Sequence, residues 1–123
     1  MKIQVLYPIF NLDKLSIKRL ELSILSILKQ NTYHKIEICI SDCSLPNKNN
    51  FDFSFNFNYK YNYNFHGTMF NKSKTINNGF ANLVDGDFFF LSDIDLIYPK
   101  NYIEEMLSNR NLSNKVLYYP VVR

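Results

Sequence analysis

Two aspartates, Asp93 and Asp95, are the side chains best suited to chemistry, and they follow an apolar run with one residue between them. Carboxylate oxygens are hard ligands that suit Mg²⁺ or Mn²⁺, which also take phosphate oxygens from a substrate. Such an ion stabilises a diphosphate as a leaving group. The pair predicts a metal site formed by Asp93 and Asp95. The alternative is that both are turn or capping residues before a helix that begins after Pro99.

The segment that precedes these aspartates predicts their position in the fold. Residues 88–91 read Phe-Phe-Phe-Leu and show no alternation of apolar with polar side chains. This pattern is typical of a strand buried on both faces, in the middle of a parallel sheet. Ligands of open α/β sheets bind outside the carboxyl ends of the strands. We therefore expect both carboxylates at that edge of a sheet.

The first third of the chain predicts a βαβ unit. Residues 3–7 indicate a strand ended by Pro8, residues 14–30 carry apolar side chains at helical spacing, and residues 35–41 alternate as a strand does. A strand, a crossover helix and a strand make the two strands parallel. We expect an α/β fold, a Rossmann-like three-layer sandwich with a mostly parallel sheet. The length of 123 residues predicts a single domain, residues 1–123.

A second helix is expected after Asn71, which would cap it. Lys72 and Lys74 fall in its first turn, where cations oppose the helix dipole. With the free backbone N–H groups they would suit an anion, although they could be solvated surface lysines. Asn77 is a donor to the site or a plain surface residue. A short third helix is expected from Tyr102 to about residue 109, with its two glutamates exposed, and a last strand over residues 116–122.

An aromatic residue occupies every odd position from 51 to 65. Period two indicates extended chain with one apolar face. We expect a hairpin that turns near residues 58–60, or one strand with a loose lead-in. The rings either pack on the sheet or a helix, or stack on sugars or bases.

Charge and cysteine usage narrow the function classes. The net charge is +3 with dispersed lysines, which argues against a nucleic-acid groove. Cys39 and Cys43 lack zinc-site spacing, so we expect reduced thiols in a cytoplasmic protein. No signal peptide opens the sequence and no apolar run is long enough to cross a bilayer. Peripheral association with a membrane stays open, as does a homo-oligomer.

The order of these parts resembles the nucleotide-binding half of GT-A glycosyltransferases. The residues that carry the resemblance are the Ser41-Asp42-Cys43-Ser44 strand end, the segment 70–80 with its Asn77-Asn78-Gly79-Phe80, and the segment 90–97 with Asp93-Ile94-Asp95. The general layout is that of glycosyltransferase family 2. The amino-acid sequence of the last two segments is similar to that of the β-1,4-galactosyltransferase family.

The resemblance implies roles for named residues. The turn at residues 7–11, with Pro8 and Asn11, would contact uridine diphosphate, and Asp42 would bond the base or the ribose. Lys72 would contact the diphosphate. Asp93 would touch the ribose, the metal or the sugar, and Asp95 would ligate Mn²⁺. The reaction implied is an inverting transfer of a hexose from a UDP-sugar to a glycan or a lipid-linked acceptor.

The chain departs from that family in three places. The arginine-rich first turn is here residues 10–13, Phe-Asn-Leu-Asp, and Cys43 replaces a small residue. The acceptor site and the catalytic base would lie beyond Arg123, so the catalytic residue is unknown. Two alternatives follow: a catalytically inactive GT-A-like module that serves assembly or regulation of a glycan-synthesis complex, and a nucleotidyltransferase or other nucleotide binder that shares only the layout.

Overall fold

The computed structural model describes residues 2–48, 54–86 and 88–108. Along the chain lie β1 (Lys2–Ile9), α1 (Lys14–Leu28), β2 (Lys35–Asp42), a short 3₁₀ turn (Pro46–Lys48), β3 (Lys60–Tyr63), α2 (Lys72–Leu83), β4 (Phe88–Leu91) and α3 (Tyr102–Ser108). The expected helices and the first strands are confirmed within two residues at most boundaries. The strand expected over residues 116–122 lies outside the described residues, as do aromatic positions 51 and 53.

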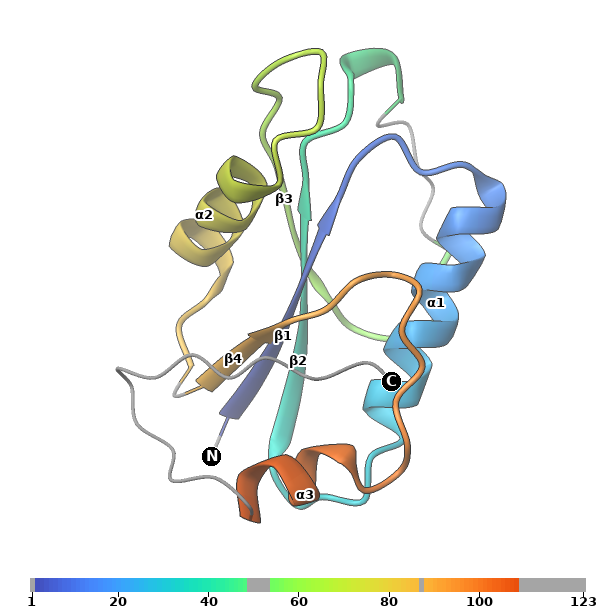
Figure 1. The fold of residues 1–123 in the computed structure, drawn as a ribbon, viewed down its shortest axis with the longest axis vertical. Coiled ribbons are helices and arrows are strands. Elements are labelled where there is room, and N and C mark those ends of the chain that lie inside the picture. The colour runs from blue at the N-terminus through green and yellow to red at the C-terminus, as the bar shows by residue number, and fades with distance from the viewer. Residues whose placement is uncertain (1, 49–53, 87, 109–123) are drawn as a thin grey trace.

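The four strands form one sheet in the order β3-β2-β1-β4, and every neighbouring pair is parallel. In Figure 1, α1 and α3 cover one face of this sheet and α2 covers the other. The three-layer α/β prediction is therefore confirmed. In the part of the chain that the structure describes, no helix is both long enough and apolar enough to cross a bilayer.

The two sets of alternate side chains on β1 explain the layers. Val5 and Tyr7 belong to a core cluster with Leu20 and Ile24 of α1. Leu6 points to the other face, where it packs with Leu83 of α2 and other buried residues. Because β1 is covered on both faces, it carries the fully buried centre of the domain.

The position of β4 corrects one expectation. Within the described residues β4 pairs with β1 alone and is therefore the outermost of these four strands, whereas the sequence predicted a place in the middle of the sheet. Its apolar run still has the expected cause, which is contact on both faces, because successive rings cover opposite faces of the sheet. Phe89 lies 5.0 Å from Phe80 of α2, and Phe90 contacts Tyr98 and Tyr102 on the other face. Two covered faces produce an unbroken apolar run in an edge strand as well.

Pro8 does not end the first strand, as the sequence predicted, because β1 continues to Ile9. The backbone of Leu6 faces β4 and its carbonyl accepts a bond from Ser92 N at 3.0 Å. Pro8 lies two residues further on and faces the same side, beyond the last residue of β4. No strand of the described residues pairs with Pro8 on that side and requires its N–H, so proline is tolerated within the strand.

The aromatic repeat forms no hairpin in residues 54–65. It enters β3 at Lys60 after an irregular lead-in, and β3 runs parallel to β2. Phe55, Phe57 and Tyr59 pack against the core on the α1 face, and the first two rings stack at 4.8 Å. The strand with a loose lead-in is therefore confirmed, and the packed aromatic face is confirmed for these three rings, whereas Tyr61 and Phe65 are 38% and 42% exposed.

Candidate functional site

The strand order creates a topological switch point between β1 and β4. The chain passes from β1 through β2 to β3 on one side of β1 and then returns to place β4 on the other side. The strand order thus reverses between β1 and β4, and the connections that follow both strands lie on the face that α1 and α3 cover (Figure 1). In open α/β sheets ligands bind outside the carboxyl ends of the strands at such a point. Here that position is occupied by Phe10 and Asn11 after β1, and by the segment from Ser92 to Asp95 after β4.

Lys72 and Asp93 meet at this edge of the sheet. Lys72 Nζ donates to Asp93 Oδ1 at 3.1 Å, although the residues are 21 positions apart in sequence. Their side chains are 53% and 61% exposed. An ion pair as exposed as this contributes little to stability, so a ligand can exchange partners with it at small cost. Asn71 caps α2, because its Oδ1 accepts from Lys74 N at 3.0 Å.

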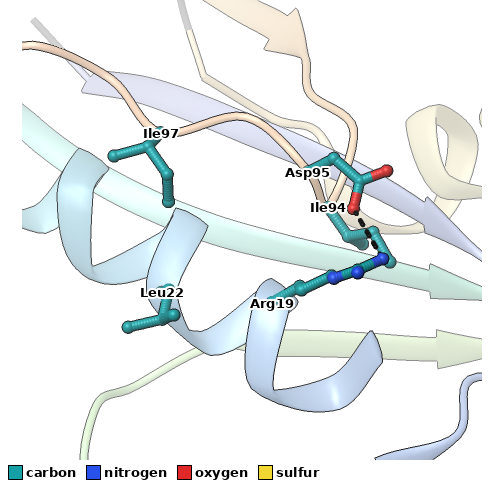
Figure 2. Close-up of a pocket in the computed structure, with 5 residues that line it drawn as sticks. All are labelled: Arg19, Leu22, Ile94, Asp95 and Ile97. Carbon is teal, nitrogen blue, oxygen red and sulfur yellow. Dashed lines mark ion pairs between the residues drawn. The ribbon is translucent and has the colours of Figure 1, made fainter. Parts of the chain in front are cut away.

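Asp95 pairs with a cation on the other side of the sheet. Arg19 of α1 approaches Asp95 Oδ1 at 3.7 Å, and the Asp95 side chain is 67% exposed (Figure 2). Because α1 and α2 cover opposite faces, Asp93 and Asp95 face cations from different layers (Figure 1). A backbone bond from Leu96 N to Asp93 O at 3.4 Å closes the turn that contains both acids.

The turn that contains Asp93 and Asp95 offers a divalent ion only part of its ligands. Within residues 2–48, 54–86 and 88–108, no three His, Cys, Asp or Glu side chains gather as a metal cluster. A site built by protein ligands alone is therefore not formed there. Magnesium-type sites commonly use one or two carboxylates, with substrate phosphates and waters completing the shell. Asp93 and Asp95 are exposed carboxylates of the kind such a site uses, but they pair with cations on opposite faces of the sheet, so one ion would be held by both only if they left Lys72 and Arg19.

Asp42 ends β2 at the same edge of the sheet but is 1% exposed. Its Oδ1 accepts bonds from the backbone N–H and the hydroxyl of Ser44, and its Oδ2 accepts from Tyr61 OH at 2.6 Å. Burial, together with the neighbouring carboxylate, raises the pKa of Tyr61, so its hydroxyl stays protonated as a donor. Both oxygens of Asp42 are thus engaged within the protein.

Asn11 joins the connection after β1 to the connection after β2. Its φ angle is +49°, a left-handed conformation that asparagine tolerates better than most residues. Asn11 N donates to Ser44 Oγ at 2.8 Å, and Asn11 Oδ1 accepts from Leu45 N at 3.0 Å. These bonds hold a backbone conformation at the switch point that the chain would otherwise disfavour.

The two remaining predicted site residues, Pro8 and Asn77, differ in their exposure to solvent. Pro8 is buried inside β1, whereas Asn77 is exposed on α2. Phe10 belongs to the turn that was expected to contact UDP, whereas Phe70 was given no role of its own; the two rings stack at 5.6 Å with 13° between their planes. Phe70 is 43% exposed and precedes the α2 cap. Phe10 comes just after β1 and Phe70 just before α2, and these positions in the sequence could have marked both as candidate site residues.

Loop 66–73 borders a hollow of about 500 Å³ beside the N-terminus of α2, and Lys72 and Phe70 line it. Cys43 and Thr75 lie behind this loop, and Thr75 Oγ1 donates to Cys43 Sγ at 2.9 Å. Burial raises the pKa of the Cys43 thiol, so it is a packing residue and not a thiolate ligand.

No protein-family model, curated protein or solved structure matches the chain. The fold and the arrangement of side chains at the switch point are therefore the basis for the function proposed below.

Proposed function

We propose that this chain is the nucleotide-sugar-binding part of a metal-dependent glycosyltransferase with a GT-A-like fold. The complete reaction would transfer a hexose from a UDP-sugar to a glycan or a lipid-linked acceptor. The observation that carries the proposal is the approach of Lys72 to Asp93 at 3.1 Å beside the switch point. A diphosphate at this position needs a cation, which Lys72 supplies, and its divalent metal ion needs a carboxylate, which Asp93 supplies. The two residues come from distant parts of the chain.

The chemistry of each side chain suggests its role in the proposed site. Asp93 and Asp95 would hold Mn²⁺ or Mg²⁺, and the bound ion would neutralise charge on the departing diphosphate. Lys72 would bind the diphosphate directly. The stacked Phe10 and Phe70 offer an apolar surface near that position.

Phosphate binding is less favourable at the N-terminus of α1. Asp13 caps that helix, and its Oδ1 accepts from Ser16 N at 2.8 Å. This bond lowers the pKa of Asp13, which keeps a negative charge where an anion would approach. The diphosphate is therefore expected on the α2 side, beside Lys72.

The proposed partners follow from this chemistry. They are a UDP-sugar donor and a glycan or lipid-linked acceptor, with no nucleic acid. We expect the protein in the cytoplasm, with peripheral membrane contact as an option. Two free cysteines, Cys39 and Cys43, are buried in the fold and agree with a reducing compartment.

Calorimetric titration with UDP and Mn²⁺ tests the proposal. The wild type should bind UDP in the presence of Mn²⁺. Asp95→Ala should weaken that binding about tenfold or more, because a charged ligand interaction of 1.4 kcal/mol or above is lost. Glu105→Ala is the matched control, since Glu105 is an exposed acid on α3. Absence of binding by the wild type, or equal affinity of Asp95→Ala, would contradict the proposal.

A second candidate is a catalytically inactive GT-A-like module that serves assembly or regulation of a glycan-synthesis complex. It is favoured because the proposed ligand-binding carboxylates already have partners within the protein. Asp93 pairs with Lys72, Asp95 pairs with Arg19, and the carboxylate of Asp42 is buried and hydrogen-bonded. This candidate predicts a stable complex with a partner chain and no hydrolysis of any UDP-sugar, with or without metal. Detectable turnover excludes it.

A further inference from the structure

The loop that joins β3 to α2 carries the densest group of exposed apolar side chains in the part of the chain that the structure describes. Ten large apolar side chains are exposed among the described residues, and three of them, Phe65, Met69 and Phe70, belong to this β3–α2 loop. The other seven are spread from α1 to the segment after β4. Met69 is 81% exposed. In Figure 1 the β3–α2 loop lies at one end of the longest axis of the molecule.

Both ends of the β3–α2 loop are held in place, whereas its apex projects. At its start Asn64 N donates to Asp42 O at 2.9 Å, and at its end the ring of Phe70 stacks on Phe10 at 5.6 Å. Gly67 at the apex has a φ angle of +144°, a conformation that other residues rarely adopt. A Cβ at Gly67 would meet no atom within 4 Å, so the apex borders open space. The fold therefore presents the exposed side chains of this loop on a projection.

The connections after β2 and after β3 make this end of the molecule basic. Residues 43–48 and 64–74 contain three exposed lysines, Lys48, Lys72 and Lys74, and no Asp or Glu. Lys72 is paired at the edge of the sheet, whereas no ion pair among the described residues involves Lys48 or Lys74. The two connections are neighbours, because β2 and β3 are adjacent parallel strands. Exposed apolar and cationic side chains therefore share one end of the molecule.

We propose that the β3–α2 loop docks the protein on the surface of an anionic lipid bilayer. Phe65 and Met69 would enter the boundary between headgroups and acyl chains, and Lys48 and Lys74 would face the lipid phosphates. A bilayer is deformable, so it accepts a projecting apolar tip without a preformed pocket. An interface between two copies of the chain is less favourable, because a two-fold axis through the loop would bring like-charged lysines together. The inference goes beyond the proposed function and depends on neither a nucleotide nor a metal.

Co-sedimentation with phospholipid vesicles, without UDP or metal, tests the loop. Vesicles of phosphatidylglycerol and phosphatidylcholine in equal parts offer charge and an apolar interior, pure phosphatidylcholine offers the interior alone, and soluble polyglutamate offers the charge alone. The variants are Met69→Ser and Lys74→Gln. Tyr33→Ser and Lys35→Gln are the matched controls, because these exposed residues lie before and at the start of β2, at the opposite edge of the parallel sheet. All four positions are exposed, so circular dichroism should show unchanged folds.

The wild type should sediment with the anionic vesicles and should bind neither phosphatidylcholine vesicles nor polyglutamate at the same concentration. High salt should release it, because ions screen the attraction between lysines and lipid phosphates. Met69→Ser should weaken vesicle binding about tenfold, since an apolar side chain no longer leaves water. Lys74→Gln should weaken it about fivefold, which is the share of one lysine near an anionic surface. Tyr33→Ser and Lys35→Gln should bind as the wild type does.

Three results would overturn the inference: no binding to anionic vesicles, equal binding to phosphatidylcholine or polyglutamate, or equal losses in the loop variants and their controls. Light scattering of the protein in solution adds a fourth. A dimer that Met69→Ser dissociates would make the loop an interface between copies of the chain. Binding of UDP with Mn²⁺ by a protein that ignores the vesicles would refute the docking loop alone.

Discussion

The hydroxyl of Tyr61 in β3 donates a hydrogen bond of 2.6 Å to Asp42, the last residue of β2. Asp42 is buried and also accepts from Ser44, which in turn accepts from the backbone of Asn11. Tyr61, a residue of the aromatic repeat, is thus linked to the residues at the switch point by its hydrogen bond to Asp42. β3 is not only a packing element, because it holds the connections after β1 and β2 in place.

Tyr61→Phe should destabilise the protein by about 1–3 kcal/mol, because a buried carboxylate loses a donor that water cannot replace. Urea denaturation measures the change. Tyr33→Phe is the matched control, since Tyr33 is 87% exposed and the same hydroxyl is removed there without cost. Equal stability of the two variants would show that the Asp42 network does not bear on the fold.

Gly79→Ala should also destabilise the protein, although alanine favours helices. A Cβ at position 79 would lie 2.7 Å from Ser41 Cβ and 2.8 Å from Leu6 Cδ1. The expected overpacking cost of about 1–3 kcal/mol exceeds the gain in helix propensity of about 1 kcal/mol. Ser73→Ala, at an exposed position of α2, should change the free energy of unfolding by less than about 0.5 kcal/mol. A stabilised Gly79→Ala variant would mean that α2 lies further from the sheet.

The stability of the fold should fall as the pH rises above 9. Burial raises the pKa of Cys39 from 9.0 to about 11. The unfolded chain therefore releases the Cys39 proton at lower pH than the folded chain does. The contribution is complete below pH 9 and is lost between pH 9 and 11, at no more than about 1.4 kcal/mol for each unit.

Urea denaturation between pH 8.5 and 10.5 measures this slope, because the range begins below the ordinary thiol pKa of 9.0 and ends below the raised pKa of about 11. Cys39→Ala should show a shallower decrease than the wild type, because one of the titrating groups is gone. Tyr61 and Tyr98 titrate in the same direction, so a smaller slope remains. Identical slopes for both proteins would mean that the thiol ionises in the folded state as it does in the unfolded one.

Much of the architecture could be predicted from periodicity. The helical spacing over residues 14–30 and the alternation over 35–41 specify the βαβ unit, and Asn71 was recognised as the cap of α2. These features are local, so single-sequence patterns capture them. The lateral order of strands is not local, which explains why β4 was expected in the middle of the sheet and is the outermost of the described strands.

The site was predicted in part for the same reason. Asp93 and Lys72 were assigned to one ligand and do lie side by side. Arg19 was overlooked because it is an ordinary surface residue of α1 until the segment after β4 approaches it. Glu104 was expected on the exposed side of α3, but it accepts a bond from the Thr32 hydroxyl and lies 4.0 Å from His34. Such contacts between distant segments have no signature in the sequence.

Paramagnetic broadening by Mn²⁺ in the presence of UDP tests the central claim most directly. In the amide spectrum of the labelled protein, substoichiometric Mn²⁺ should first broaden the signals of Asn11, Lys72, Asp93 and Asp95, which surround the switch point. The signals of Tyr33 and Glu105, in the segment before β2 and on α3, should remain sharp. Broadening that is uniform over the molecule, or that begins at Tyr33 and Glu105, would contradict the site.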